Sequence, residues 1–353
     1  MRWYSLNKIK VLVVDDSALM RKIISDMVNV EENMEVIDIA RDGEDFLNKL
    51  SKIKPDVITL DVEMPKIDGI TALKEMKKRN INIPVIVLSS VSKQGTELTM
   101  ECLESGAFDF IPKPSGPISL DINKVREDLI QKINLAFDKY NKSKNINSMP
   151  IETYNNSKKK IAGKIKAVVI GASTGGPKAL YAVITKFPEN LGVPVFVVQH
   201  MPEGFTKAFA DRLNLNSKIN VEEARDLQLV EKNTVYVAPG GYHMEVFKDK
   251  KIHLNTEPSV WGVRPAVDKL FSSAAGVYGE SLLSVVLTGM GRDGANGTIE
   301  VKKNSGITIA EDKSSCTIYG MPRAAFETGM VDIVIPLDKI AAEIISIIKE
   351  GEG

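Results

Sequence analysis

The sequence predicts an α/β protein with two doubly wound domains, a five-stranded parallel one followed by a larger, mainly parallel one. Short β-branched runs alternate with amphipathic helical segments, which is typical of parallel sheets covered by helices. At 353 residues the chain is longer than one hydrophobic core usually organises. Residues 140–166 are rich in Asn, Lys and Ser and lack apolar periodicity, as a solvated linker does. The alternative, one large domain with an exposed loop, is disfavoured by the length.

The predicted domains are residues 1–139 and 167–353, joined by the linker. The 46 basic residues balance the 46 acidic ones, so no overall field attracts the chain to nucleic acid or to an anionic membrane. The only cysteines, Cys102 and Cys316, form no CxxC pair, which argues against a disulfide framework or a zinc site. No apolar run has the length of a spanning helix, and the N-terminus lacks the apolar core of a signal peptide. We expect a cytoplasmic protein without membrane insertion.

Five strands are expected in the first domain. Each is a short apolar run followed by an amphipathic segment or a turn, so the five form one parallel sheet. They cover residues 11–16, 35–40, 56–61, 84–90 and 108–112. In such sheets the ligand binds beyond the carboxyl ends of the strands.

Polar residues gather at those ends. Asp15 and Asp16 end the first strand, Asp61 the third and Ser89 the fourth, and Lys113 follows the fifth. Carboxylates this close repel one another unless a cation joins them, and an oxygen-only cluster suits Mg²⁺. A carboxylate beside Mg²⁺ can attack a phosphoryl donor, and Lys113 and Ser89 could hold the resulting charge. Helix capping would explain Asp15 or Asp16 alone, but it does not explain the whole group.

The same residues lie in segments that resemble a response-regulator receiver domain. The resemblance extends over residues 8–135 and rests on VLVVDDS, ITLDVEMPKIDG, VIVLSS and FIPKP. It implies a flavodoxin-like fold with an aspartate that is phosphorylated in the presence of Mg²⁺. The implied roles are phosphoacceptor for Asp61, metal ligands for Asp15 and Asp16 together with Asp61, switch hydroxyl for Ser89, and the receiver lysine for Lys113.

The second domain repeats the alternation. Strands are expected at 165–172, 193–200, 234–239 and 282–289, with some antiparallel strands within residues 220–254. These four runs again place their carboxyl ends at one edge of a sheet.

A G-x-S-x-G string at Gly171, Ser173 and Gly175 follows the first of these runs. It matches neither the dinucleotide fingerprint nor the phosphate loop of nucleotide hydrolases. A glycine turn at a helix start can still bind phosphate through free backbone N–H groups, and this alternative stays open. If Ser173 is instead a nucleophile, it needs a base and an orienting acid.

The histidines narrow the search for the base. His200 ends the second run at the same sheet edge as Ser173, whereas His243 and His253 are expected to face solvent or neighbouring strands. Asp293 follows the fourth run in a glycine turn. The order Ser173, His200, Asp293 differs from that of α/β-hydrolases, so the G-x-S-x-G string alone would mislead. Singly, each residue also suits a structural role as a cap, a satisfied histidine or a turn residue.

Six segments in order resemble the chemotaxis protein-glutamate methylesterase family, CheB. They are GASTGG, QHMP, APGG, RPAVDKLF, LTGMGRDGA and YGMPRAA, and with the receiver they cover nearly the whole chain. The resemblance implies that Ser173 is the nucleophile, His200 the general base and Asp293 the orienting acid. The implied substrate is a glutamate γ-methyl ester on the cytoplasmic helices of a chemoreceptor, and related enzymes also deamidate receptor glutamines.

The surroundings of this triad are less defined. Oxyanion donors are expected among backbone N–H groups near Thr174 and in the glycine turn after Met290, without a cofactor in the esterase site. Thr174 could instead orient His200 or begin the helix. Arg264 and Pro265 are expected to start a helix, where Arg264 could bind acidic receptor side chains or simply lie at the surface.

A receiver joined to a hydrolase predicts control by phosphorylation, with the receiver covering the active-site edge until Asp61 gains negative charge. The resemblance to the methylesterase family implies that a chemotaxis histidine kinase supplies the phosphate. The main alternative is a non-enzymatic response regulator whose second domain binds a partner. A nucleic-acid output domain is disfavoured, because the sequence has no helix-turn-helix signature or basic stripe.

Overall fold

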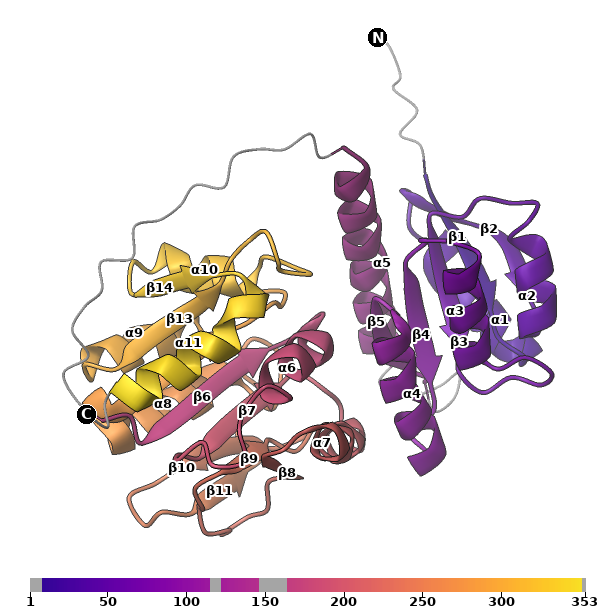
Figure 1. Ribbon diagram of the computed structural model, residues 1–353. Helices are drawn as coiled ribbons and strands as arrows, with labels where there is room; N and C mark the ends of the chain where they lie inside the picture. The colour runs from indigo at the N-terminus through magenta and orange to yellow at the C-terminus, as the bar shows by residue number, and fades with distance from the viewer. Residues whose placement is uncertain (1–7, 115–121, 146–163, 351–353) are drawn as a thin grey trace. The chain divides into compact units, whose positions relative to one another are not determined.

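The computed structural model describes residues 8–114, 122–145 and 164–350, and the chain divides into two compact units, residues 1–149 and 150–353 (Figure 1). The predicted linker at 140–166 contains this division. Helix α5 (Ile122–Asn145) continues beyond residue 140, where the linker was predicted to start. Residues 146–163 lie outside the described residues. Each unit is described by itself below.

The first unit contains one five-stranded sheet in the order β2-β1-β3-β4-β5, with every neighbouring pair parallel. Its strands are β1 (Ile9–Val14), β2 (Met34–Ala40), β3 (Val57–Asp61), β4 (Val85–Ser89) and β5 (Asp109–Pro112). Its other helices are α1 (Ala18–Asn29), α2 (Gly43–Lys49), α3 (Gly69–Lys78) and α4 (Lys93–Ser105). Helices α1 and α5 cover one face, and α2, α3 and α4 pack side by side on the other. The five predicted parallel strands are confirmed.

Helices of this unit begin where a polar side chain can accept an N–H hydrogen bond from the first turn. Ser17 accepts from the Met20 N–H before α1, and Asp42, Asp68 and Ser92 do the same before α2, α3 and α4. Such caps each stabilise a helix by about 1 kcal/mol. They place the helix starts next to the carboxyl ends of the strands.

The second unit contains a seven-stranded, fully parallel sheet in the order β14-β13-β12-β6-β7-β9-β8. The strands are β6 (Ala167–Ala172), β7 (Val195–Gln199), β8 (Asn220–Glu223), β9 (Thr234–Val237), β12 (Leu282–Val286), β13 (Ile307–Glu311) and β14 (Ile333–Ile335). The antiparallel strands expected within 220–254 are found only in the separate hairpin of β10 (His243–Val246) and β11 (Ile252–Asn255). Strands β8 and β9 join the parallel sheet instead.

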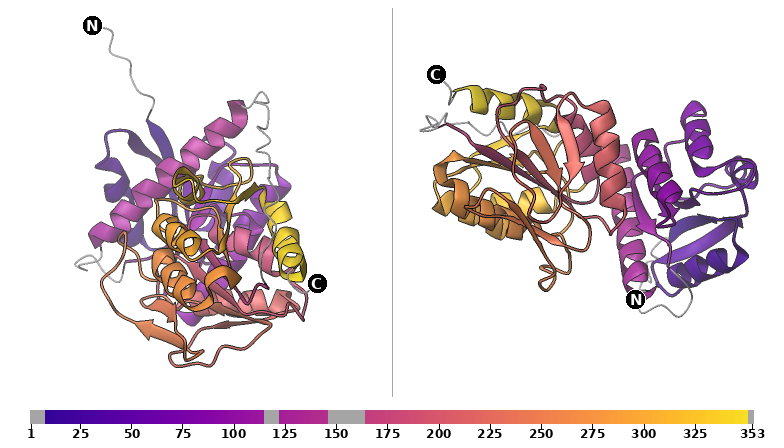
Figure 2. Two further views of the ribbon diagram at one scale, coloured as in Figure 1. Left: turned by 90° about the vertical axis from the view of Figure 1, so that its left-hand side faces the viewer. Right: turned by 90° about the horizontal axis from the view of Figure 1, so that it is seen from below.

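Helices lie on both faces of this sheet (Figures 1 and 2). They are α6 (Gly176–Ile184), α7 (Phe205–Asn216), α8 (Val267–Tyr278), α9 (Ala295–Lys303), α10 (Met321–Glu327) and α11 (Leu337–Glu350), with a short 3₁₀ turn at Gly279–Ser281. No helix in the described part of the chain combines the length and the apolar character that crossing a bilayer requires.

The strand order positions the site. From β6 the chain first adds β7, β9 and β8 on one side and later adds β12, β13 and β14 on the other. The order therefore reverses at β6, and loops that follow β6 and its neighbours β7 and β12 open a crevice at the carboxyl edge. The core beneath this edge joins the sheet to α8, and Phe271 of that helix is fully buried.

We expect Gly297→Ala to destabilise the second unit. Helices α8 and α9 approach so closely that a Cβ at Gly297 would lie 2.5 Å from Cβ of Phe271. Overpacking of this kind costs about 1–3 kcal/mol, which thermal unfolding would record as a lower Tm. The control is Gly276→Ala on α8, where the added Cβ meets no heavy atom within 4 Å and removal of a helical glycine is favourable. Equal Tm values for the two variants would contradict the close crossing.

Candidate active site and phosphorylation site

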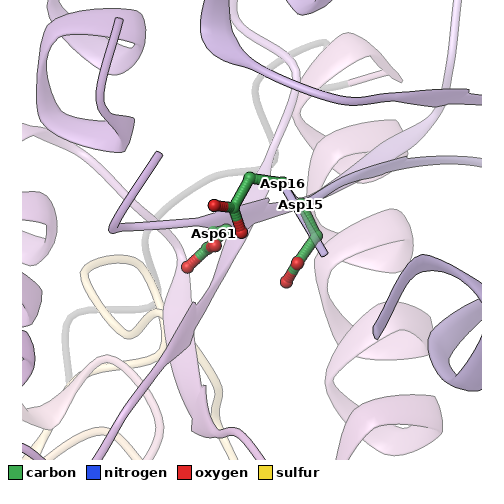
Figure 3. Close-up of side chains that lie close together, drawn as sticks. All are labelled: Asp15, Asp16 and Asp61. Atoms are coloured by element: carbon green, nitrogen blue, oxygen red, sulfur yellow. The ribbon is translucent and has the colours of Figure 1, made fainter. Parts of the chain in front are cut away.

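Three carboxylates meet at the carboxyl ends of β1 and β3. One oxygen from each of Asp15, Asp16 and Asp61 lies within 4.8 Å of the other two (Figure 3). Asp15 and Asp61 are buried, whereas Asp16 is exposed. The structure thus brings together the acidic residues that the sequence placed at one sheet edge.

Lys113 is the cation in contact with this cluster. Its Nζ lies 2.9 Å from Oδ2 of Asp15 and 2.7 Å from Oδ2 of Asp61, so one ammonium contacts both buried carboxylates. Burial and then the charge of Asp15 raise the pKa of Asp61 to about 6, against the lowering effect of Lys113. One lysine leaves the negative charge incompletely balanced, and an oxygen-only donor set of this kind fits a hard divalent cation such as Mg²⁺.

The Ser89 hydroxyl belongs to a separate hydrogen-bond group. It is fully buried, donates toward the backbone oxygens of Gly95 (3.0 Å) and Ser90 (3.1 Å), and accepts from Oγ1 of Thr99 at 2.6 Å. Its partners therefore lie on α4 and in the turn before it. Contact with a group on Asp61 would require the hydroxyl to leave these partners.

His200 and Asp293 form the central contact of the second unit. His200 follows β7, Asp293 lies in the turn after β12, and Nε2 of His200 is 2.8 Å from Oδ2 of Asp293. The Asp293 carboxylate is 2% exposed and also accepts the N–H groups of Val267 (2.6 Å) and Asp268 (2.8 Å) at the start of α8. Asp293 therefore holds the imidazole through Nε2 and leaves Nδ1 as the nitrogen that can accept a proton.

Ser173 follows β6, the strand next to β7. Its N–H donates to the Thr288 oxygen at 3.0 Å, and its own oxygen accepts from Gly176 N–H (2.7 Å) and from Nε2 of Gln199 (3.0 Å). The side chain is partly exposed, and its hydroxyl makes no hydrogen bond with any described residue. The backbone of Ser173 is thus fixed, while Oγ stays available for chemistry.

Gln199 is a supporting residue that sequence reasoning missed. Its side chain is buried at the end of β7, and its amide Nε2 donates to the backbone oxygens of both Ser173 and His200, at 3.0 and 3.1 Å. One amide therefore joins the loops that carry Ser173 and His200. A polar residue closing an apolar strand just before His200 was the available signal.

The turn after β12 packs directly against the serine loop. A Cβ at Gly289 would lie 2.8 Å from Cβ of Ser173. Thr288, also missed, donates through Oγ1 to the Thr174 oxygen at 3.0 Å and accepts the Ile318 N–H at 2.8 Å. These contacts fix the distance between the two turns.

Several backbone donors are unpaired beside this junction. In the described residues the N–H groups of Thr174 and Met290 form no hydrogen bond, and neither do those of Gly175 and Gly291. They lie in the two regions where oxyanion donors were expected. The buried Thr174 side chain makes no hydrogen bond with His200 among these residues, so the structure gives no support to an orienting role for its hydroxyl.

Asp268 completes the network and was also missed by sequence reasoning. Its Oδ1 accepts the N–H groups of Gly294 (2.9 Å) and Gly297 (2.7 Å) at the start of α9, while its own N–H donates to Asp293. Asp293, which precedes α9, therefore caps α8, and Asp268, which lies in α8, caps α9. This exchange fixes Asp293 from both sides.

Two expectations need correction. Helix α8 begins after Ala266 rather than at Arg264, and Nη1 of Arg264 donates to the backbone oxygens of Thr256 (2.7 Å) and Glu257 (3.0 Å), so this arginine holds its own loop. His243 does not face solvent. It is fully buried, its Nδ1 accepts the Ala266 N–H at 3.2 Å, and burial lowers its pKa.

Comparison with known proteins agrees with this geometry. Residues 168–344 match the family model described as CheB methylesterase, and residues 11–123 match that of the response regulator receiver domain. A protein-glutamate methylesterase/protein-glutamine glutaminase of Clostridium acetobutylicum is 57% identical over 346 residues, covering 98% of this chain and 99% of the relative. The chain belongs to the CheB methylesterase family. A protein of the same name from Pyrococcus abyssi is 46% identical over 352 residues, covering 98% of this chain and 95% of the relative.

A solved structure of the family agrees as well. The crystal structure of the Thermotoga maritima CheB methylesterase catalytic domain has 43% sequence identity and a TM-score of 0.51, covering 52% of this chain and 99% of that domain. The predicted family, fold class and enzyme class, a carboxylic ester hydrolase carrying a receiver domain, are confirmed.

We expect Asp61→Asn to stabilise the first unit at neutral pH when chelator keeps metal away. Because the folded-state pKa of about 6 exceeds the ordinary value of 3.8, the wild-type side chain favours folding below about pH 4 and loses that contribution as the pH rises through about 6. The stability gain from the asparagine should therefore approach about 3 kcal/mol at pH 8 and vanish near pH 4. Denaturant unfolding at both pH values measures it.

The control for this experiment is Asp26→Asn, which removes an exposed carboxylate of α1 paired with Lys22. This variant should show no comparable gain. A stability difference for Asp61→Asn that stays constant from pH 4 to pH 8 would contradict the raised pKa.

Proposed function

We propose that this chain hydrolyses glutamate γ-methyl esters on the cytoplasmic helices of chemotaxis receptors, releases methanol, deamidates receptor glutamines, and is controlled by phosphorylation of Asp61. The observation that carries the proposal is the 2.8 Å contact between Nε2 of His200 and Asp293, beside a serine loop on the adjacent strand. The names of the relatives supply the substrate class. The cytoplasmic location expected from the sequence belongs to the same proposal.

The first half of the reaction forms a covalent intermediate. Oγ of Ser173 attacks the ester carbonyl carbon while Nδ1 of His200 takes the hydroxyl proton. Asp293 keeps the other ring proton on Nε2 and stabilises the imidazolium that forms. His200 then gives its proton to the departing methoxide, so methanol leaves and the glutamyl group remains on Ser173.

The second half restores the enzyme. Nδ1 of His200 takes a proton from water as the water oxygen attacks the glutamyl ester, and the proton then returns to Oγ of Ser173. The receptor leaves with a free glutamate carboxylate at that position. The same sequence on a glutamine side chain releases ammonia in place of methanol, which corresponds to deamidation.

The negative charge on the carbonyl oxygen needs donors in both halves. The N–H groups of Thr174 and Met290, which have no hydrogen-bond partner among the described residues, are our assignment for this role. Thr174 follows the nucleophile directly, and Met290 follows the glycine that contacts it. Each such donor typically contributes about 100-fold or more to the rate.

The acidic cluster of the first unit is assigned to phosphorylation. Asp15, Asp16 and Asp61 would hold Mg²⁺, which when bound offsets the negative charge of the carboxylates and of the incoming phosphoryl group. Lys113, already 2.7 Å from Asp61, can contact a phosphoryl oxygen. Ser89 can do so after its hydroxyl leaves α4, and a histidine kinase is the proposed donor.

The nucleophile is tested by Ser173→Ala. Methanol release from methylated receptor should fall by about 10³-fold or more, because the hydroxyl is the attacking group. Ser272→Ala, which removes an exposed serine of α8, is the matched control and should keep the wild-type rate. Wild-type turnover by a folded Ser173→Ala protein would exclude the covalent route through this residue.

The switch is tested with a small phosphodonor and Mg²⁺. The wild-type rate should rise when both are present and stay at its basal value when either is left out. Asp61→Asn should not respond, because it lacks the attacking carboxylate. An equal response from Asp61→Asn, measured by methanol release, would rule out Asp61 as the controlling phosphoacceptor.

A further inference from the structure

An exposed arginine stands next to the triad acid. Arg292 directly precedes Asp293 in the turn after β12, and its guanidinium carbon lies 5.0 Å from the ring centroid of Trp261. Trp261 is itself 51% exposed. In the described part of the chain Arg292 has neither an ion pair nor a hydrogen bond through its guanidinium. Its charge therefore faces solvent beside the catalytic turn.

Three other arginines of the second unit form ion pairs or hydrogen bonds. Arg225 pairs with Glu222 and Arg323 with Glu327, while Arg264 donates to backbone oxygens. Arg292 differs from these three because an aromatic face alone supports it. A guanidinium stacked on an indole keeps its N–H edge free to bind a carboxylate with two parallel hydrogen bonds.

The aromatic support is anchored to the catalytic network. Nε1 of Trp261 donates to Oδ2 of Asp268 at 2.9 Å, and Asp268 donates its N–H to Asp293 at 2.8 Å. Trp261 also adopts φ +53° in a turn closed by two hydrogen bonds between Val260 and Val263. An indole held this way in a left-handed conformation, and half exposed, is poorly explained by core packing.

We infer that Arg292, supported by Trp261, binds a carboxylate of the substrate protein close to the ester that is hydrolysed, so that this enzyme prefers ester sites flanked by an acidic residue. The inference rests on the proposed function, which makes the substrate a protein rich in glutamate side chains and their esters. A neighbouring glutamate on the same helix would place its carboxylate within reach of the catalytic turn. Arg292 is then a specificity-determining residue rather than a catalytic one.

The test uses two helical peptides with one glutamate γ-methyl ester each. One carries glutamate one helical turn away on both sides of the ester, and the other carries glutamine there. Wild-type kcat/KM, measured by methanol release, should be about fivefold higher for the glutamate-flanked peptide. Arg292→Gln should bring the ratio close to one, and Arg292→Glu should prefer a lysine-flanked peptide instead.

Two further variants separate binding from general charge. Arg225→Gln removes one positive charge from an exposed site after β8, the edge strand on the opposite side of β6 from β12. This variant should keep the wild-type ratio. Trp261→Phe removes the hydrogen bond to Asp268 and should lower the ratio. Added salt should also lower it in the wild type, because exposed ion pairs are screened.

The outcomes are distinct. An unchanged ratio in Arg292→Gln, or no wild-type preference despite hydrolysis of both peptides, would overturn the inference and leave the proposed function standing. Failure of the wild type to hydrolyse either peptide or methylated receptor would overturn the proposed function and this inference with it.

Discussion

The catalytic geometry depends on one exchange of hydrogen bonds, in which Asp293 caps α8 and Asp268 caps α9. A buried carboxylate is costly unless its oxygens accept hydrogen bonds, and here the free N–H groups of two helix starts donate to both carboxylates. The exchange fixes the angle between the helices as well as the two side chains. His200 is oriented by one of these carboxylates and Trp261 by the other, so the imidazole and the exposed indole share one support.

The buried carboxylates of the two units differ in how completely their charge is compensated. In the second unit every buried carboxylate oxygen of Asp293 has a donor, and the result is a fixed orientation. In the first unit Asp15 and Asp61 are buried with Lys113 as the contacting cation, and burial raises the pKa of Asp61 to about 6. An incompletely compensated cluster of this kind is suited to binding and reaction, because a cation or a phosphoryl group changes its energy strongly.

Much of the fold could be predicted from the sequence, and so could the polar residues that gather at the two sheet edges, since strand runs and their carboxyl ends are local patterns. The supporting partners could not. The sequence marks Gln199 only as a polar residue at the end of an apolar strand, and Asp268 acts through contacts with a segment far from it in the chain, which no spacing rule identifies. Arg264 was expected to start a helix near substrate, but the turn that precedes α8 directs its guanidinium to backbone oxygens. His243 was misjudged because a short polar-looking strand gave no sign that its imidazole is enclosed.

The strand order also determines which ring nitrogen of His200 contacts Asp293. Neighbouring strands lie about 4.8 Å apart, and the imidazole of His200 extends from β7 across β6 toward β12. The far nitrogen, Nε2, therefore reaches Asp293, and Nδ1 stays on the side of the ring nearer to β7. The ring nitrogen that contacts Asp293 is thus a consequence of the strand order, because β6 separates the two strands that His200 and Asp293 follow.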